Sequence, residues 1–207
     1  STLQAGPEFA LWRESHNKKT EPSVDDGEAI VLTRDGGVVN AVLNRPGSRN
    51  AVSVEMRDAF VDALTLLAAD TSIANMHFSG NGPCFSVGGE LQEFGTAPDP
   101  ATAHWVRTVH SPARLMAQLR DRISCYVHGA CIGSGIELPA FSSHLAASKK
   151  TFFQLPELSL GLIPGAGGTV SIARRIGRQR TAGLVLTGKK INAQIALDWG
   201  LVDEVVG

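Results

Sequence analysis

Short apolar strands alternate with helical segments along this chain, and this alternation constrains the fold more than any other feature of the sequence. The expected strands are short apolar runs: 29–33, 38–43, 76–80, 124–127, 144–147, 151–154 and 201–206. The expected helices carry apolar residues at helical spacing: 54–70, one or two within 100–120, a buried one after 129, 169–176 and 193–199. Strand and helix together recur about every 30–40 residues, which predicts an α/β fold.

The composition is that of a folded globular domain. The chain holds 207 residues, 43% of them hydrophobic and 19% charged, with a formal net charge of −1. An apolar fraction of this size supplies a core, and the balanced charge lacks the basic surface with which proteins bind nucleic acid. No apolar run approaches the roughly 18–20 residues of a membrane span. We therefore expect neither a nucleic-acid nor a membrane partner.

The cysteines and the N-terminal segment bear on compartment and organisation. Cys84, Cys125 and Cys131 are odd in number and form no CxxC pair, which indicates reduced thiols in a cytoplasmic protein rather than disulfides or zinc. The N-terminus lacks an apolar signal core, and a mitochondrial matrix location after removal of a leader stays open. We expect residues 1–27, which end in TEPSVDDG, to form a flexible lead-in, and residues 28–207 to form the folded domain.

Three glycine-rich segments are candidates for chemistry: FSVGGEL (85–91), GSGIEL (133–138) and LPELSLGLIPGAGGT (155–169). None has the GxxxxGKS/T or GxGxxG pattern of a nucleotide-binding loop. A cysteine nucleophile elbow at GACIG (129–133) is a second alternative. That arrangement needs an acid and then a histidine downstream, whereas the only later histidine, His144, precedes any suitable acid. Cys131 is therefore expected to be a small buried residue.

Two of the glutamates in these segments lie next to apolar runs. Glu137 falls in the apolar stretch 131–141, and Glu157 follows Pro156 at the end of a strand-like run. An unpaired carboxylate in apolar surroundings is costly, so each glutamate taken alone is better explained as a helix cap or a salt-bridged carboxylate than as a functional group. Two such carboxylates beside two glycine-rich turns favour another interpretation. Backbone N–H groups at a turn can hold a developing oxyanion while nearby carboxylates move protons.

The same segments resemble the crotonase (enoyl-CoA hydratase/isomerase) superfamily. SGNGPCFSVGGELQEF is similar to the first oxyanion loop of that family, and SCYVHGACIGSGIELPAFSSHLAAS to its second oxyanion turn and the helix that follows. FFQLPELSLGLIPGAGGTVSIARRIG is similar to the most recognisable block of the family. LNRPGSRNAVS and LTGKKINAQIALDWGLVDEVV match flanking patterns in the right order, so the resemblance covers residues 29–207.

The resemblance implies a spiral of ββα units that forms two near-perpendicular sheets, assembled as a homotrimer or hexamer. It also implies that residues 28–207 are an acyl-CoA-binding catalytic domain. Family members generally continue past a segment like LVDEVV with several helices, whereas this sequence ends at Gly207. We therefore expect a fold that lacks most of the usual C-terminal helical segment, and a correspondingly weakened trimer.

By position, the resemblance assigns the oxyanion hole to the backbone N–H groups of Gly89 and Ser134, and acid–base chemistry to Glu137 and Glu157. The implied coenzyme A contacts lie in two loops: Ser48, Arg49, Val87, Gly89 and Leu91. Coenzyme A then enters as part of the acyl-CoA substrate, and neither a prosthetic group nor a metal is expected.

Hydratases of this family hold a water molecule with two glutamates, and both positions are glutamate here. We therefore expect an enoyl-CoA hydratase in which Glu137 is the base and Glu157 the acid. The alternatives are an enoyl-CoA isomerase, for which one glutamate can suffice, other crotonase-type thioester chemistry, and a catalytically inactive crotonase-like module.

Overall fold

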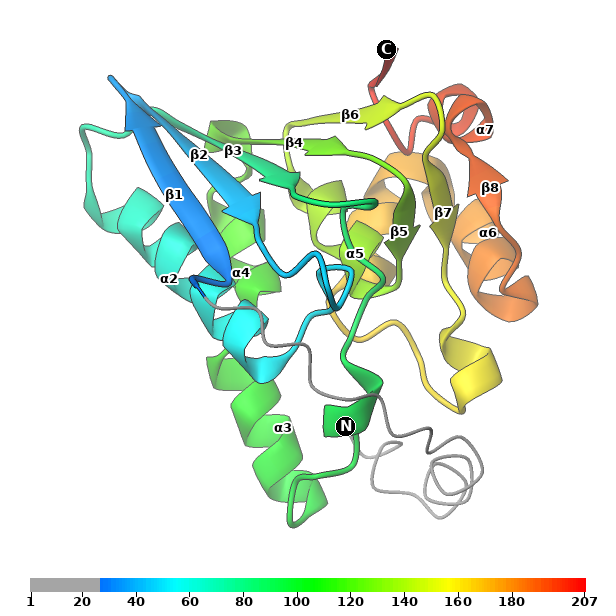
Figure 1. The fold of residues 1–207 in the computed structure, drawn as a ribbon. Helices are drawn as coiled ribbons and strands as arrows, with labels where there is room; N and C mark the ends of the chain where they lie inside the picture. The colour runs from blue at the N-terminus through cyan, green and yellow to red at the C-terminus, as the bar shows by residue number, and fades with distance from the viewer. Residues whose placement is uncertain (1–26) are drawn as a thin grey trace.

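Two β-sheets with helices packed around them form the part of the chain that the computed structural model describes, residues 27–207 (Figure 1). The strands are β1 (Ile30–Asp35), β2 (Val38–Leu43), β3 (Asn75–Gly80), β4 (Ile123–Val127), β5 (Ala130–Ile132), β6 (His144–Ser148), β7 (Phe152–Gln154), β8 (Ile191–Asn192) and β9 (Glu204–Val206). The α-helices are α2 (Val54–Ala69), α3 (Pro100–Val109), α4 (Pro112–Gln118), α5 (Ser134–Glu137), α6 (Gly168–Thr187) and α7 (Ala193–Trp199). Short 3-10 turns are η2 (Leu91–Glu93), η3 (Arg120–Arg122), η4 (Pro139–Phe141) and η5 (Glu157–Leu160).

The larger sheet has the strand order β1-β2-β3-β4-β6-β9. β1 and β2 form an antiparallel hairpin, and all the other neighbours pair in parallel. In β2, Val39, Ala41 and Leu43 are buried while the residues between them are partly exposed, as expected for a strand with one covered face. Helix α2 packs beside this sheet (Figure 1). Its Phe60 stacks on Phe78 of β3, with ring centroids 5.3 Å apart. The main core therefore lies between the larger sheet and its helices.

The smaller sheet has the order β5-β7-β8, and its strands run across the direction of the larger sheet (Figure 1). The chain alternates between the two sheets, because β4 and β6 belong to the larger one and are followed by β5 and β7 of the smaller one. β5 and β7 are parallel, with Ile132 in register with Gln154. Their carboxyl ends therefore lie side by side, and the segments that leave them start close together.

The predicted two-sheet α/β architecture is confirmed, but three local predictions are wrong. The last strand, expected over 201–206, forms only over Glu204–Val206. The helix expected to end at residue 176 continues as α6 to Thr187, because the chain resumes the helix directly after an interruption at Gly177 (φ 81°, ψ 161°). The segment after residue 129, expected to turn into a buried helix, first forms the strand β5 and then only the four-residue α5. Strands and helices this short carry no usable periodicity.

The ends of the described chain bear on two further expectations. The predicted lead-in falls outside the described residues except for Gly27. The chain reaches its last residue, Gly207, directly after β9. Within residues 27–207, no helix combines the length and the apolar character that crossing a membrane requires.

Candidate active site

Three chain segments run side by side where β5 and β7 end. The loop after β3 lies along β5 through a bridge between Ser86 and Cys131. The turn after β5 is tied to β7 because the Gly133 N–H donates to the Gln154 carbonyl oxygen at 3.0 Å. Glu157 follows directly in the segment that leaves β7. The topology thus brings the three glycine-rich segments of the sequence to one place.

Glycines let two of these segments approach at backbone distance. A Cβ added at Gly135 would lie 2.5 Å from the carbonyl oxygen of Ser86, and one added at Gly88 would lie 2.6 Å from the last carbonyl oxygen of β5. Both distances are far inside van der Waals contact, so neither position accepts a side chain unless the backbone moves. Gly89 and Ser134, the neighbours of these glycines, therefore sit on two facing turns.

The backbone N–H groups of Gly89 and Ser134 are available to a ligand. Within residues 27–207 neither donates to a protein acceptor, whereas the adjacent N–H groups of Glu90 and Gly133 do. Ser134 is the first residue of α5, where an N–H has no acceptor within its own helix. The Ser134 hydroxyl is also buried without a hydrogen-bond partner in the described chain. Two unpaired N–H groups on facing turns suit a carbonyl oxygen that gains negative charge.

Glu137 is anchored by the start of α6. The residue is 2% exposed, and its Oε2 accepts hydrogen bonds from the N–H groups of Ala166 and Gly168, both at 2.8 Å. Its backbone carbonyl accepts a third hydrogen bond from the Ser171 hydroxyl at 2.7 Å. N–H groups at a helix start stabilise negative charge. The side chain is therefore held as an oriented carboxylate.

Glu157 is buried without comparable donors. It is 8% exposed, and its Oε2 has no hydrogen-bond partner among the described residues. Its Oε1 lies against the turn after β5, because a Cβ added at Gly133 would stand 2.8 Å from that oxygen. Burial, and next the negative charge of Glu137, raise the pKa of Glu157 to about 7. A carboxyl group with this pKa can both give and take protons near neutral pH.

The residues predicted to contact coenzyme A border the same loops. The Val87 N–H donates to the Arg49 carbonyl oxygen at 3.2 Å, which joins the loop of Ser48 and Arg49 to the loop that carries Gly89. Leu91 begins η2 and is 39% exposed. The Arg49 side chain is exposed and makes no ion pair or hydrogen bond within the described chain. A free guanidinium beside the site is suited to a phosphate.

The sequence did not reveal which backbone N–H groups donate hydrogen bonds to Glu137. The run GAGGT (165–169) indicates a glycine-rich loop, but nothing in it shows that the N–H groups of Ala166 and Gly168 bind a carboxylate that lies 29 and 31 residues earlier in the chain. The structure explains why Gly168 has no side chain. A Cβ there would lie 2.6 Å from the Cγ of Glu137.

The rival chemistries weighed from the sequence can be compared with the same geometry. Cys131 is fully buried, and burial raises the pKa of its thiol well above the usual value. A buried thiol of this kind is a poor nucleophile, which agrees with a packing role. Within residues 27–207, no three histidine, cysteine, aspartate or glutamate side chains are grouped as metal ligands.

We expect Gly168→Ala to displace Glu137, because the new methyl group would overlap its side chain. Overpacking of this kind costs about 1–3 kcal/mol of unfolding free energy, to be measured by urea denaturation. A displacement of about 1 Å can lower activity by about 100-fold. Gly183→Ala is the matched control in the same helix, since nothing lies within 4 Å of its added Cβ. The unfolding free energy of Gly183→Ala should be higher than that of the wild type by about 0.5–1 kcal/mol. Equal behaviour of the two variants would contradict the contact at Gly168.

Comparison with known proteins adds a family context to these residues. The sequence model of the family described as Enoyl-CoA hydratase/isomerase matches residues 33–207. The chain is 35% identical to the 2,3-dehydroadipyl-CoA hydratase of Escherichia coli, over 85% of this chain and 68% of that protein. It is 31% identical to the 1,2-epoxyphenylacetyl-CoA isomerase of Escherichia coli, over 86% of this chain and 70% of that protein.

Solved structures of enoyl-CoA hydratases also resemble this chain. The crystal structure of enoyl-CoA hydratase from Mycobacterium smegmatis matches with a TM-score of 0.81 and 27% identity, over 87% of this chain and 71% of that chain. The chain spans roughly two thirds of the length of the curated relatives it matches.

Proposed function

Because the chain belongs to the enoyl-CoA hydratase/isomerase family, we propose that it adds water across the 2,3 double bond of a 2-enoyl-CoA. The observation that carries this proposal is the pair of buried glutamates, Glu137 and Glu157, beside two unpaired backbone N–H groups. Hydration needs a base for the water and an acid for the carbon, and the pair supplies one group for each.

In this proposal the thioester carbonyl oxygen accepts hydrogen bonds from the N–H groups of Gly89 and Ser134. Attack of water at C3 pushes electrons through C2 onto that oxygen, so the bound state becomes an enolate. Each preorganised N–H donor contributes on the order of 10²–10³ in rate at comparable sites. The two N–H groups act on the transition state because negative charge on the oxygen grows as the new C–O bond forms.

The two carboxyl groups handle the protons. The anchored Glu137 accepts a proton from the attacking water, and protonated Glu157 delivers a proton to C2 of the enolate. The product is a 3-hydroxyacyl-CoA. One proton has then moved from Glu157 to Glu137, and its return resets the pair for the next turnover. The coupled pair titrates as a unit, and the pKa of about 7 at Glu157 fits the role of acid.

The direct test is the loss of enoyl absorbance when the purified protein meets crotonyl-CoA and a longer 2-enoyl-CoA. Turnover on either substrate supports hydration, and comparison of the two maps the preferred acyl length. A folded protein that binds coenzyme A but turns over neither substrate would reject the proposed hydratase.

The rate is expected to depend on pH through Glu157. Its pKa lies near 7, and the acid form is the one that gives a proton to C2. The value of kcat/KM should therefore fall above pH 7, approaching tenfold per pH unit. In Glu137→Gln the negative charge that raises the pKa of Glu157 is gone, so the residual activity should decline at a lower pH. A value of kcat/KM that instead rises as the pH increases through 7 would assign Glu157 as the base.

Coenzyme A binding is expected to involve Arg49, and its substitution should change KM more than kcat. An exposed ion pair is worth up to about 1 kcal/mol, so Arg49→Ala should raise KM for crotonyl-CoA by up to about fivefold. Arg178→Ala removes another exposed arginine, remote in sequence from these loops, and should leave KM unchanged. The comparison at low and high salt shows whether the effect is electrostatic.

Isomerisation of a 3-enoyl-CoA is the second candidate, favoured by the unequal anchoring of the two carboxylates. Glu157 has an unpartnered oxygen and a pKa near 7, so it alone suits a group that takes a proton from C2 and returns it to C4. Hydration needs Glu137 as well. Glu137→Gln should therefore lower the hydration rate by about 10²–10⁴-fold but retain isomerisation, and an assay with both substrates separates the two functions.

We also propose a cytoplasmic homotrimer or hexamer, formed by the catalytic domain of residues 28–207. The resemblance to the family supports the assembly, and the free thiols of Cys84, Cys125 and Cys131 support a reduced compartment such as the cytoplasm. Sedimentation velocity of the purified chain tests the assembly, and a monomer at micromolar concentration would contradict it.

A further inference from the structure

A cavity of about 280 Å³ lies between η3, η4, α6 and the residues after α7. None of its lining residues belongs to the oxyanion turns or to the residues predicted to contact coenzyme A. Its walls carry three arginines, Arg120, Arg174 and Arg175, and one acid, Asp203. The space is at the lower limit for a drug-sized ligand and ample for a small anion.

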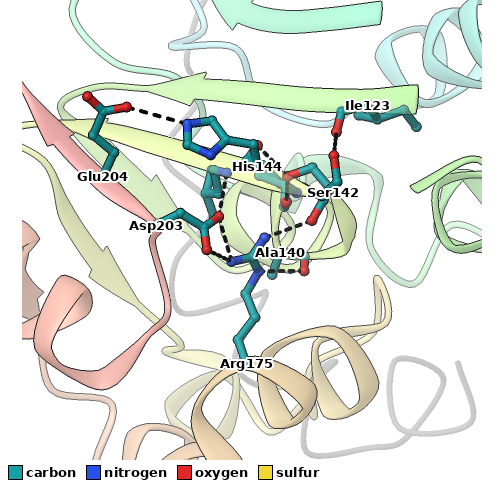
Figure 2. A network of polar contacts seen from close by, with 10 residues as sticks. Ile123, Ala140, Ser142, His144, Arg175, Asp203 and Glu204 are labelled. Carbon is teal, nitrogen blue, oxygen red and sulfur yellow. Dashed lines mark hydrogen bonds and ion pairs between the residues drawn. The ribbon is translucent and has the colours of Figure 1, made fainter. Parts of the chain in front are cut away.

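Arg175 is committed to the protein. Figure 2 shows its guanidinium extending from α6 to Ala140, Ser142 and Asp203. Nε donates to the Ala140 carbonyl oxygen at 2.9 Å and one terminal nitrogen to the Ser142 carbonyl oxygen at 2.7 Å. The other terminal nitrogen donates to both carboxylate oxygens of Asp203, at 3.0 and 3.2 Å. The charges of Arg175 and Asp203 therefore compensate each other.

The serine hydroxyls of the cavity wall are committed as well. Each donates its single proton to a backbone carbonyl oxygen, at 2.7 Å for Ser142 and Ser171 and at 2.9 Å for Ser143. A hydroxyl has only one proton to donate. These groups therefore cannot donate to a ligand while the present hydrogen bonds persist.

Arg120 and Arg174 remain available. Arg174 makes no hydrogen bond or ion pair within the described chain. Arg120 has a 3.6 Å contact with its sequence neighbour Asp121, with the two side chains 52% and 91% exposed, and such a pair contributes little. Two arginines without a strong acidic partner thus line a cavity whose other charged groups, Arg175 and Asp203, compensate each other. Guanidinium groups match the oxygens of phosphate, and two positive charges favour a doubly charged anion.

We propose that this cavity binds a dianionic phosphate group, either as inorganic phosphate or as a phosphate monoester, between Arg120 and Arg174. The binding does not rest on the hydratase reaction. The cavity nevertheless shares a wall with the active site, because Ser171 lines it and holds the Glu137 carbonyl.

Calorimetric titration of inorganic phosphate into the full chain, with ionic strength held constant by sodium chloride, tests the proposal without any turnover. We expect one saturable site. The variant Arg120→Ala/Arg174→Ala should weaken it on the order of tenfold or more, as expected for the loss of charge-assisted hydrogen bonds. Each single variant should account for part of that loss. Glycerol 3-phosphate, titrated separately, identifies a monoester as the better ligand if it binds more tightly.

Two controls separate this site from general charge effects. Arg178→Ala, also on α6 but outside the cavity, should leave phosphate binding unchanged, and so should Arg49→Ala. Both cavity arginines are without strong partners, so the double variant should keep the wild-type melting temperature. The absence of saturable binding in the wild type overturns the proposal. Binding that survives the double variant but weakens in Arg49→Ala also overturns it, because the phosphate would then occupy the coenzyme A region.

Discussion

Glu157→Gln is expected to lower kcat for hydration of crotonyl-CoA by about 10²–10⁴-fold, the usual contribution of a positioned acid or base. Glutamine is close in size to glutamate, so it fills the same space against Gly133. It cannot, however, donate a proton to C2 at any working pH. Glu157 is buried and its Oε2 lacks a partner in the described chain, so no group hydrogen-bonded to this oxygen can donate the proton in its place.

A stability measurement separates the loss of a proton donor in Glu157→Gln from a defect in folding. The pKa of Glu157 is raised from 4.5 to about 7 in the folded protein, so the folded state binds the proton more tightly than the unfolded state. Its contribution to stability is full below pH 4.5 and is lost as the pH rises to about 7, by on the order of 2–3 kcal/mol. Glu157→Gln lacks this loss. Its unfolding free energy relative to the wild type should therefore increase between pH 5 and pH 8.

The result that would sink the assigned role is a folded Glu157→Gln variant with near wild-type kcat. The proton donor at C2 would then be another group. Loss of activity together with loss of stability at pH 8 would instead point to a structural defect.

Ser134→Pro should reduce kcat/KM by about 10²–10³-fold, because proline removes the backbone N–H that the proposed mechanism places on the enolate oxygen. Ser134 is the first residue of α5, the helix position at which proline is best tolerated. The substitution therefore removes one of the two proposed oxyanion donors and leaves the intrahelical hydrogen bonds intact. Steady-state kinetics with crotonyl-CoA gives the effect, and circular dichroism verifies the fold.

Ser134→Ala is the matched control, since alanine keeps the N–H and removes only the hydroxyl. That hydroxyl is buried without a partner in the described chain, and removing an unpaired polar group is neutral or stabilising. We expect near wild-type kinetics from this variant. If alanine impairs catalysis as much as proline does, the side chain rather than the backbone donor carries the function.

Elements that depend on their own residues, such as the helix 54–70 and the first hairpin, could be predicted from the sequence. The helix 54–70 needs only its own apolar spacing, and Ser53 caps it by accepting a hydrogen bond from the Met56 N–H. The hairpin of the first two strands is likewise visible in alternation around two glycines. The short strand β5 and the continuation of α6 beyond Gly177 depend instead on pairing and packing with distant residues, which a local pattern does not contain.

The candidate site divides in the same way. Glu137 and Glu157 stand out in the sequence because carboxylates within apolar, glycine-rich segments need a reason to be there. The sequence does not show, however, that the two carboxylates have different environments. One is bound by the N–H groups of Ala166 and Gly168, and the other is left without donors among the described residues. These contacts join loops that only the folded topology brings together.

The glycine contacts around the two turns limit how this enzyme can change under mutation. Gly88 and Gly135 face backbone carbonyl oxygens, and Gly168 faces the Glu137 side chain, each at less than 3 Å from where a Cβ would stand. Any other residue at these positions displaces the two turns or the Glu137 side chain, whatever its effect on substrate choice. Exposed neighbours such as Arg49 and Leu91 carry no such restriction. New substrate preferences should therefore evolve at the rim of the site, while the reaction at its centre stays fixed.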